Sequence, residues 1–150
     1  IGEYDVNREG SGDMYSKGAN LLHTIRTICG DDEKWRNVLR GLNKEFYHKT
    51  VTTKEIEDYI SKSMNVDLSK VFDQYLRDVR IPLFEYYFEN GKIYYKWSNV
   101  ITGFDMPIEI NLDNNPIKLF PETDWKYLKT IEDNIELNKN YYVKSNEFFN

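Results

Sequence analysis

The apolar pattern of this 150-residue chain changes its period once, at Arg80-Ile81-Pro82. Before this point, apolar residues recur every three or four positions, which predicts amphipathic helices. After it, short apolar and aromatic runs separated by turn residues predict strands. Pro82 cannot continue a helix, because it lacks the backbone N–H and its ring clashes with the preceding turn. The sequence therefore predicts an α+β fold, with an N-terminal helical lobe over residues 1–82 and a small antiparallel β-sandwich over residues 83–150.

The helical half contains about four amphipathic segments with short polar connections. Asp31 or Asp32 can cap the second helix, Thr52 and Glu55 fit a capping box for the third, and Asp67 is a candidate cap for the fourth. The expected apolar stripes are Leu21, Leu22, Ile25, Ile28 and Cys29; Trp35, Val38, Leu39, Leu42 and Phe46; Ile56, Tyr59, Ile60 and Met64; and Leu68, Val71, Phe72, Tyr75 and Leu76.

The β half begins with two strand-like runs on either side of Asn90-Gly91, a dipeptide typical of tight hairpins. The expected strands are 83–88, 92–97, 106–112, 117–120 and 125–131, with 141–143 as a candidate last strand. The segments 113–116 and 121–124 are expected to be connections. No internal repeat or low-complexity linker separates the halves, so we expect them to pack directly.

Composition excludes several classes of function. The net charge is −5 with a sequence pI near 5.1 and no basic run, which argues against a nucleic-acid partner. No apolar run approaches the ~20 residues of a membrane span. Cys29 is the single cysteine, so an internal disulfide is impossible and the redox compartment stays open. Ile1 in place of Met indicates a processed product or a fragment of a longer protein, from which an export signal could have been removed.

The histidines do not indicate a metal site. His23 and His48 are the only two, and neither lies in a ligand spacing such as His-Glu-x-x-His. We expect a structural His23, a His48 that favours the dipole of a helix end, and no metal ligand within the chain.

Other candidate sites are equally weak. Cys29 is expected to be a small core residue. The loop Gly10-Ser11-Gly12 lacks the Gly-Lys-Ser/Thr of a phosphate loop, so no cofactor-binding residue is expected. Glu55, Glu57 and Asp58 are expected on the solvated side of a helix.

Tyr15 is the one residue with a strong catalytic interpretation. It lies at the opening turn of the first helix, directly after a Gly-rich approach. Gly18 and Ala19 remove bulk one turn later, which lets another element or a ligand come close. On composition alone a packing role is the simpler interpretation, and the spacing of the motif favours a catalytic one.

The run Tyr15-Ser16-Lys17-Gly18-Ala19 resembles the Tyr-x-Lys-Gly-Ala motif of the aminopeptidase N-like zinc metallopeptidases, of the gluzincin class. The resemblance covers nearly the whole chain and is most specific in residues 10–82. Ser16 replaces the Glu common in the motif, and Tyr75 stands where Trp is frequent. The β half is similar to the small sandwich domain found next in several members. The other similar segments are 22–26, 30–35, 52–55 and 72–82.

The resemblance implies a mechanism. In that family, a zinc ion held by His-Glu-x-x-His and a later Glu activates water for attack on the first peptide bond. The motif tyrosine, here Tyr15, donates its hydroxyl to the oxyanion of the tetrahedral intermediate. A positioned donor of this kind is worth roughly 10²–10³ in rate. Tyrosine suits the role because the phenol of a free tyrosine has a pKa near ~10 and keeps its proton at neutral pH.

The resemblance also implies what the chain lacks. It would be the C-terminal part of a catalytic domain followed by a sandwich domain, with the zinc ligands outside this chain. Its partners would be the upstream catalytic half of the same polypeptide and a peptide substrate, and alone it would be inactive. Two alternatives stay open: a non-enzymatic module whose sandwich binds a peptide, glycan or partner domain, and a family member whose zinc motif has decayed. Exposed Tyr and Trp on one sheet face would favour the module.

Overall fold

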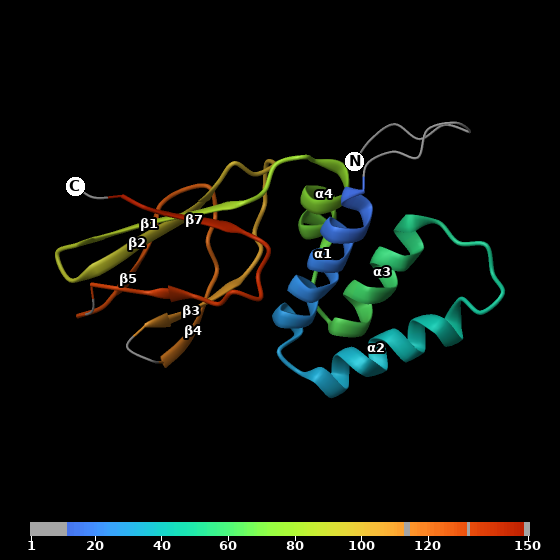
Figure 1. The fold of residues 1–150 in the computed structure, drawn as a ribbon. Coiled ribbons are helices and arrows are strands. Elements are labelled where there is room, and N and C mark those ends of the chain that lie inside the picture. Colours follow the sequence, from blue (N-terminus) through green and yellow to red (C-terminus); the bar gives the residue numbers. More distant parts are fainter. Residues whose placement is uncertain (1–11, 113–114, 132, 149–150) are drawn as a thin grey trace.

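The computed structural model describes residues 12–112, 115–131 and 133–148 (Figure 1). In this part of the chain, four helices precede two small sheets, which confirms the α+β fold with its N-terminal helical lobe. The helices are α1 (Asp13–Cys29), α2 (Asp32–Glu45), α3 (Thr53–Met64) and α4 (Ser69–Arg77). The strands are β1 (Leu83–Glu89), β2 (Lys92–Ser98), β3 (Ile108–Leu112), β4 (Asn115–Leu119), β5 (Lys126–Lys129), β6 (Glu136–Leu137) and β7 (Lys144–Glu147).

Local capping rules fix most of the helix starts. Asp31 caps α2 by accepting a backbone N–H of its first turn at 2.9 Å, and Thr52 and Glu55 form the predicted capping box of α3. The prediction for α4 was displaced by one residue. Leu68 occupies the N-cap position, and the Asp67 carboxylate beside it accepts a backbone N–H at 2.9 Å. Each of these side chains therefore satisfies one of the orphan donors at the start of its helix.

Not every apolar residue of the predicted stripes on α1 and α2 is buried. Trp35 and Val38 are buried, but Leu39 is 39% exposed, and on α1 Leu22 is 45% exposed. The second half of α2 extends away from the sandwich in Figure 1, so fewer neighbours cover its apolar side chains.

Glu57 corrects the prediction that Glu55, Glu57 and Asp58 all lie on the solvated side of α3. Glu57 is buried, and its Oε1 accepts a hydrogen bond from Arg77 Nη2 at 2.7 Å. A buried carboxylate requires such a partner. The spacing contains the signal, because Glu57 lies three residues before the buried Ile60 and so shares its face. This ion pair joins α3 to α4.

The hairpin between β1 and β2 forms as predicted. Asn90 and Gly91 both have positive φ (50° and 69°), as a two-residue type I′ turn requires. One sheet has the order β5-β2-β1-β7 and the other β4-β3-β6. Pro116 lies in β4, an edge strand, where its missing N–H removes no ladder bond from the sheet interior.

The last strands differ from the prediction. β7 forms at Lys144–Glu147 instead of 141–143, and it pairs with β1 in parallel, unlike the other strand pairs of the described residues. β6 was not predicted at all, because two residues carry no periodic signal. The predicted connection at 113–116 was partly wrong, because residues 115 and 116 belong to β4. Residues 113 and 114 of that connection and the loop residues 10 and 11 lie outside the described residues.

The sandwich core lies between the inner faces of the two sheets. Phe84 and Trp97 of the first sheet and Ile108 and Ile110 of the second are at most 1% exposed. The Trp97 indole donates to the Met106 carbonyl at 2.9 Å, so the largest core side chain leaves no buried donor unpaired.

Buried hydrogen bonds join the helical lobe to the sandwich. Thr24, Gln74 and Tyr75 are completely buried. The Tyr142 N–H donates to Thr24 Oγ1 at 3.0 Å, the Tyr75 hydroxyl donates to the Tyr142 carbonyl at 2.7 Å, and the Ile101 N–H donates to Gln74 Oε1 at 2.7 Å. Burial raises the pKa of Tyr75, which keeps its hydroxyl protonated as a donor. These bonds fix α1 and α4 against the sandwich.

Within the described residues, no helix has the length and apolar character needed to cross a membrane.

Tyr75→Phe is expected to lower the free energy of unfolding by about 1 kcal/mol, because it leaves the Tyr142 carbonyl without its donor. Urea denaturation measures the difference. Tyr94→Phe is the matched control, since no described residue hydrogen-bonds to the Tyr94 hydroxyl. Equal stability of the two variants would contradict a stabilising bond between the lobes.

Candidate functional site

Tyr15 lies in the first turn of α1, as predicted from the sequence. Its backbone N–H donates to the Gly12 carbonyl at 3.1 Å, and its side chain is 74% exposed. Among the described residues, none hydrogen-bonds to its hydroxyl. The phenol is therefore held at its base and is largely exposed among the described residues.

One side of α1 beside Tyr15 is exposed among the described residues. We call this side the open face of α1, made of Tyr15, Gly18, Ala19 and Leu22. Leu22 is 45% exposed, and a Cβ placed on Gly18 would meet no atom within 4 Å. A mid-helix glycine costs roughly 0.5–1 kcal/mol relative to alanine. Nothing in the described residues uses the room that Gly18 leaves.

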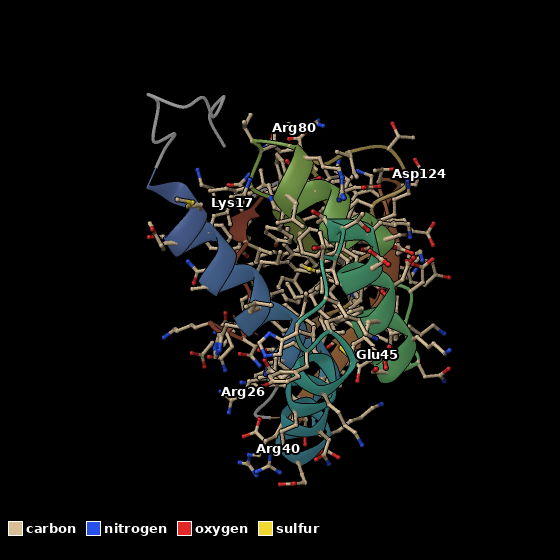
Figure 2. All side chains as sticks on the ribbon, turned by 90° about the vertical axis from the view of Figure 1, so that its right-hand side faces the viewer. Lys17, Arg26, Arg40, Glu45, Arg80 and Asp124 are labelled. Atoms are coloured by element: carbon tan, nitrogen blue, oxygen red, sulfur yellow. The ribbon has the colours of Figure 1, made fainter. Side chains whose placement is uncertain are left out.

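Lys17 points to the opposite side of α1 and anchors it. Its Nζ donates to the Asp78 carbonyl at 2.6 Å, just beyond the end of α4. The Asp78 carboxylate accepts hydrogen bonds from Arg80 Nε at 2.9 Å and Nη2 at 2.8 Å. Arg80 Nη1 donates to the Val100 carbonyl at 2.8 Å. Figure 2 shows Lys17 and Arg80 at the same end of the helical lobe. We name Lys17, Asp78, Arg80 and Val100 the anchor of Tyr15.

The anchor was not predicted from the sequence. Its signal was the spacing of Lys17, which lies four residues before the buried Leu21 and so shares the inward side of the helix. Asp78 and Arg80 lie 61 and more residues away along the chain, and no local pattern connects them to Lys17.

Arg80 determines the charge state of Asp78. Its guanidinium hydrogen bonds, followed by its backbone N–H, lower the pKa of the Asp78 carboxyl from 3.8 to about 2. The carboxylate therefore stays ionised and paired at neutral and mildly acidic pH.

The histidines and the cysteine have structural surroundings. His23 is exposed, and its Nε2 lies 3.0 Å from Asn140 Oδ1 of the sandwich. His48 follows α2 with a positive φ of 53°, and its ring contacts that of Tyr47 at 4.1 Å. Cys29 is partly buried against the core.

No metal centre is formed by residues 12–112, 115–131 and 133–148, where no three His, Cys, Asp or Glu side chains gather closely enough to hold an ion. A zinc site needs three or four such ligands. The described residues therefore do not fit a zinc ion.

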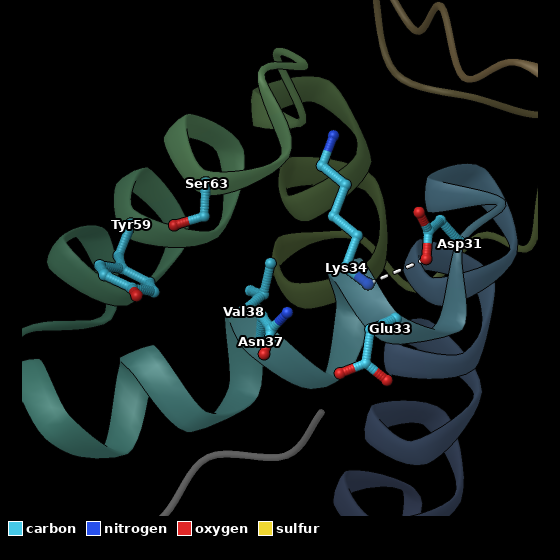
Figure 3. Close-up of a pocket in the computed structure, with 7 residues that line it drawn as sticks. All are labelled: Asp31, Glu33, Lys34, Asn37, Val38, Tyr59 and Ser63. Carbon is cyan, nitrogen blue, oxygen red and sulfur yellow. Dashed lines mark hydrogen bonds between the residues drawn. The ribbon is translucent and has the colours of Figure 1, made fainter.

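A groove of about 620 Å³ lies between α2 and α3 (Figure 3). Tyr59 and Ser63 of α3 face Val38 of α2 across it. Its charged groups already have structural partners: Asp31 caps α2, and Lys34 Nζ donates to the Met64 carbonyl at 2.9 Å. Glu33, the third charged group of the groove, pairs with Arg36, so none of the three is left for catalysis.

Among the described residues, the chemistry that this site offers is a hydrogen bond donated by the Tyr15 phenol. The fold brings Tyr15 together with Gly18 and Ala19 on one exposed surface and fixes their helix through Lys17. No described general base or metal ligand accompanies the phenol.

No protein-family model matches the sequence. Among solved structures, the chain is similar to a Legionella pneumophila aminopeptidase A, determined in complex with aspartic acid. The TM-score is 0.69 and the sequence identity 16%, and the similarity covers 93% of this chain. At this identity the comparison shows a shared fold. The chain spans 18% of the length of that aminopeptidase chain.

Gly18→Ala is expected to raise the free energy of unfolding of this chain by up to ~1 kcal/mol, because alanine is the better helix former and the space is open. Thermal or urea unfolding measures it. Ala19→Gly, on the neighbouring exposed position, is the reverse control and should destabilise by a similar amount. A Gly18→Ala variant less stable than the parent chain would contradict an open face.

Asp78→Asn is expected to have a lower free energy of unfolding than the parent chain at neutral pH, and this difference is expected to disappear in acid. The folded pKa of Asp78 is depressed, so its contribution is complete above about pH 4 and disappears as the pH falls through about 2. Urea unfolding of the parent chain and the variant across this pH range measures the difference in their free energies of unfolding. Asp124→Asn is the control, and a gap that stays constant with pH would refute the role of the Arg80 pair.

Proposed function

We propose that this chain is the C-terminal part of the catalytic unit of a zinc-dependent aminopeptidase of the gluzincin class, with the sandwich that follows it. In this proposal Tyr15 donates a hydrogen bond to the oxyanion of the tetrahedral intermediate. The substrate is a peptide, from which the N-terminal residue is removed.

The observation that carries the proposal is the placement of Tyr15. Its phenol is 74% exposed, while the helix that bears it is tied by Lys17 to the link between the lobes. An exposed aromatic side chain on a rigid base is suited to a partner that the described residues do not include. The shared fold with an aminopeptidase supports the same assignment.

The chemistry assigned to Tyr15 is electrostatic. A neutral donor aimed at developing negative charge stabilises the transition state more than the ground-state carbonyl. In this role Tyr15 is a hydrogen-bond donor, and neither a base nor a nucleophile. Lewis-acid chemistry and the activated water belong to the zinc, whose ligands we assign to the upstream half of the polypeptide.

The open face of α1 has a defined role in this proposal. Gly18 and Ala19 leave room for the upstream catalytic half or the bound peptide to approach the helix closely. This accounts for a mid-helix glycine whose cost is not recovered within the described residues.

A parent with a decayed zinc motif remains the competing hypothesis. Reading the ~100 residues encoded upstream for His-Glu-x-x-His and a later Glu separates the two. Absence of the motif would remove the catalytic role and leave a binding role.

Tyr15→Phe in the longer protein is expected to lower kcat by roughly 10²–10³ and to change KM little, because the hydrogen bond forms fully only in the transition state. Steady-state hydrolysis of an aminoacyl anilide measures both constants.

Tyr47→Phe is the matched control, because Tyr47 is also a highly exposed tyrosine of the helical lobe, 72% accessible. An unchanged kcat for Tyr15→Phe would make Tyr15 structural. Turnover of the anilide by residues 1–150 alone would overturn the assignment of the zinc ligands to another part of the protein.

A further inference from the structure

The outer side of the β5-β2-β1-β7 sheet carries a cluster of aromatic rings. We call it the aromatic face, made of Tyr87, Tyr94, Trp125, Tyr127 and Phe148. The strand register places Tyr127, Tyr94 and Tyr87 opposite one another on β5, β2 and β1. Phe148 follows β7 beside them, where its N–H donates to the backbone of β1. The rings therefore form one row across the sheet.

Three of the rings are exposed, Tyr87 and Tyr94 are half-buried, and the rings hold one another in place. Trp125, Tyr127 and Phe148 are 41%, 56% and 43% exposed. Tyr87 and Tyr94 stack with their ring centroids 4.7 Å apart and 5° between their planes. The centroid of the Trp125 ring lies 5.0 Å from that of Tyr87 and 6.2 Å from that of Phe148. Protein interfaces are enriched in Tyr, Trp and Phe. Because the rings already fix one another, they would lose little side-chain entropy when a partner docks on them.

Two lysines beside the rings form no ion pair with a carboxylate of the described residues. Lys92 and Lys129 are opposite residues of β2 and β5, on the same side as the tyrosines. Like charges placed opposite each other destabilise a sheet. Among the described residues, neither forms an ion pair; Glu89 is the register partner of Lys92, yet no ion pair joins them. Lys92 Nζ lies 4.4 Å from the centre of the Tyr127 ring.

This arrangement favours an acidic partner. The chain carries a net charge of −5, so two neighbouring lysines that form no ion pair with a described residue run against its average. Lys96 provides the contrast, because Glu85 neutralises it at 3.3 Å. Carboxylates arriving from outside would relieve the repulsion between Lys92 and Lys129 and bury the rings next to them.

The ring geometry favours a protein over a sugar. Stacking a sugar requires a free ring face. Here Tyr87 and Tyr94 cover each other, Lys92 lies over Tyr127, and Lys96 lies over Trp125 at 4.6 Å. Edges and hydroxyls remain available, and these suit the mixed polar and apolar surface of a folded segment.

We propose that the aromatic face docks an acidic segment of the same longer polypeptide, outside residues 1–150. This rests on the proposed function, in which the chain is one part of a larger enzyme. The shared fold covers 18% of the aminopeptidase chain, so a parent of similar size would have ample chain to cover this face.

Hydroxyl-radical footprinting of residues 1–150 and of the longer protein tests the proposal. We expect Trp125, Tyr127 and Phe148 to be oxidised several-fold more slowly in the longer protein. We also expect a carbodiimide, which couples an amine to a carboxylate in contact with it, to join Lys92 or Lys129 to an Asp or Glu outside residues 1–150.

Lys129→Glu supplies the matched perturbation. It turns the repulsive pair with Lys92 into an attractive one, so the sheet should stay folded while docking weakens and the rings regain the oxidation rates of residues 1–150. Lys62→Glu on α3 is the control and should leave protection unchanged.

Equal oxidation rates in the two proteins would overturn the proposal. So would cross-links formed only between two copies, which would make the partner a second molecule, or protection that appears only when a sulfated glycan is added. The readouts require no catalysis. If the longer protein is inactive but its aromatic face is protected, the proposed aminopeptidase function is refuted and the docking proposal stands. If it is active but the face is not protected, the docking proposal is refuted and the proposed function stands.

Discussion

The buried hydrogen bonds between the lobes are the constraint on which the rest of this structure depends. Thr24, Gln74 and Tyr75 have no access to water, so each must find its partner in the protein or lose the free energy of hydration without return. The partners are backbone groups of the sandwich. Helix packing alone could let α1 and α4 slide over an apolar surface. Directional bonds to fixed backbone atoms permit one arrangement.

That arrangement determines where Tyr15 lies. From the first turn of α1, Lys17 binds the chain beyond α4, and Arg80 connects the same link to the sandwich at Val100. Tyr15 is therefore positioned by both lobes, although its own ring touches neither core. The surfaces left uncovered, the open face of α1 and the aromatic face of the sheet, lie on different lobes. In our account each receives a different part of the same larger protein.

The sequence predicted what local chemistry decides. The hairpin at Asn90-Gly91, the capping box of Thr52 and Glu55, and the place of Tyr15 in the first turn of a helix each depend on residues within a few positions of one another. The parallel pairing of β7 with β1, the partner of Glu57 on another helix, and the contact between Lys17 and Asp78 depend on tertiary packing. The spacing contained a partial signal for the last two that the prediction did not use, since Glu57 lies three residues before the buried Ile60 and Lys17 four before the buried Leu21, but it named no partner. Neither the exposure of the aromatic face nor the unpaired lysines could be predicted, because the register of β5 was not known.

The central claim is that the Tyr15 hydroxyl meets a developing oxyanion in a longer protein. A crystal structure of that protein with a phosphinic peptide analogue, whose tetrahedral oxygens mimic the intermediate, tests it most directly. The account predicts the Tyr15 hydroxyl within hydrogen-bond distance of one of these oxygens, roughly 2.5–3.0 Å. A Tyr15 ring packed against protein and pointing away from the analogue would contradict it.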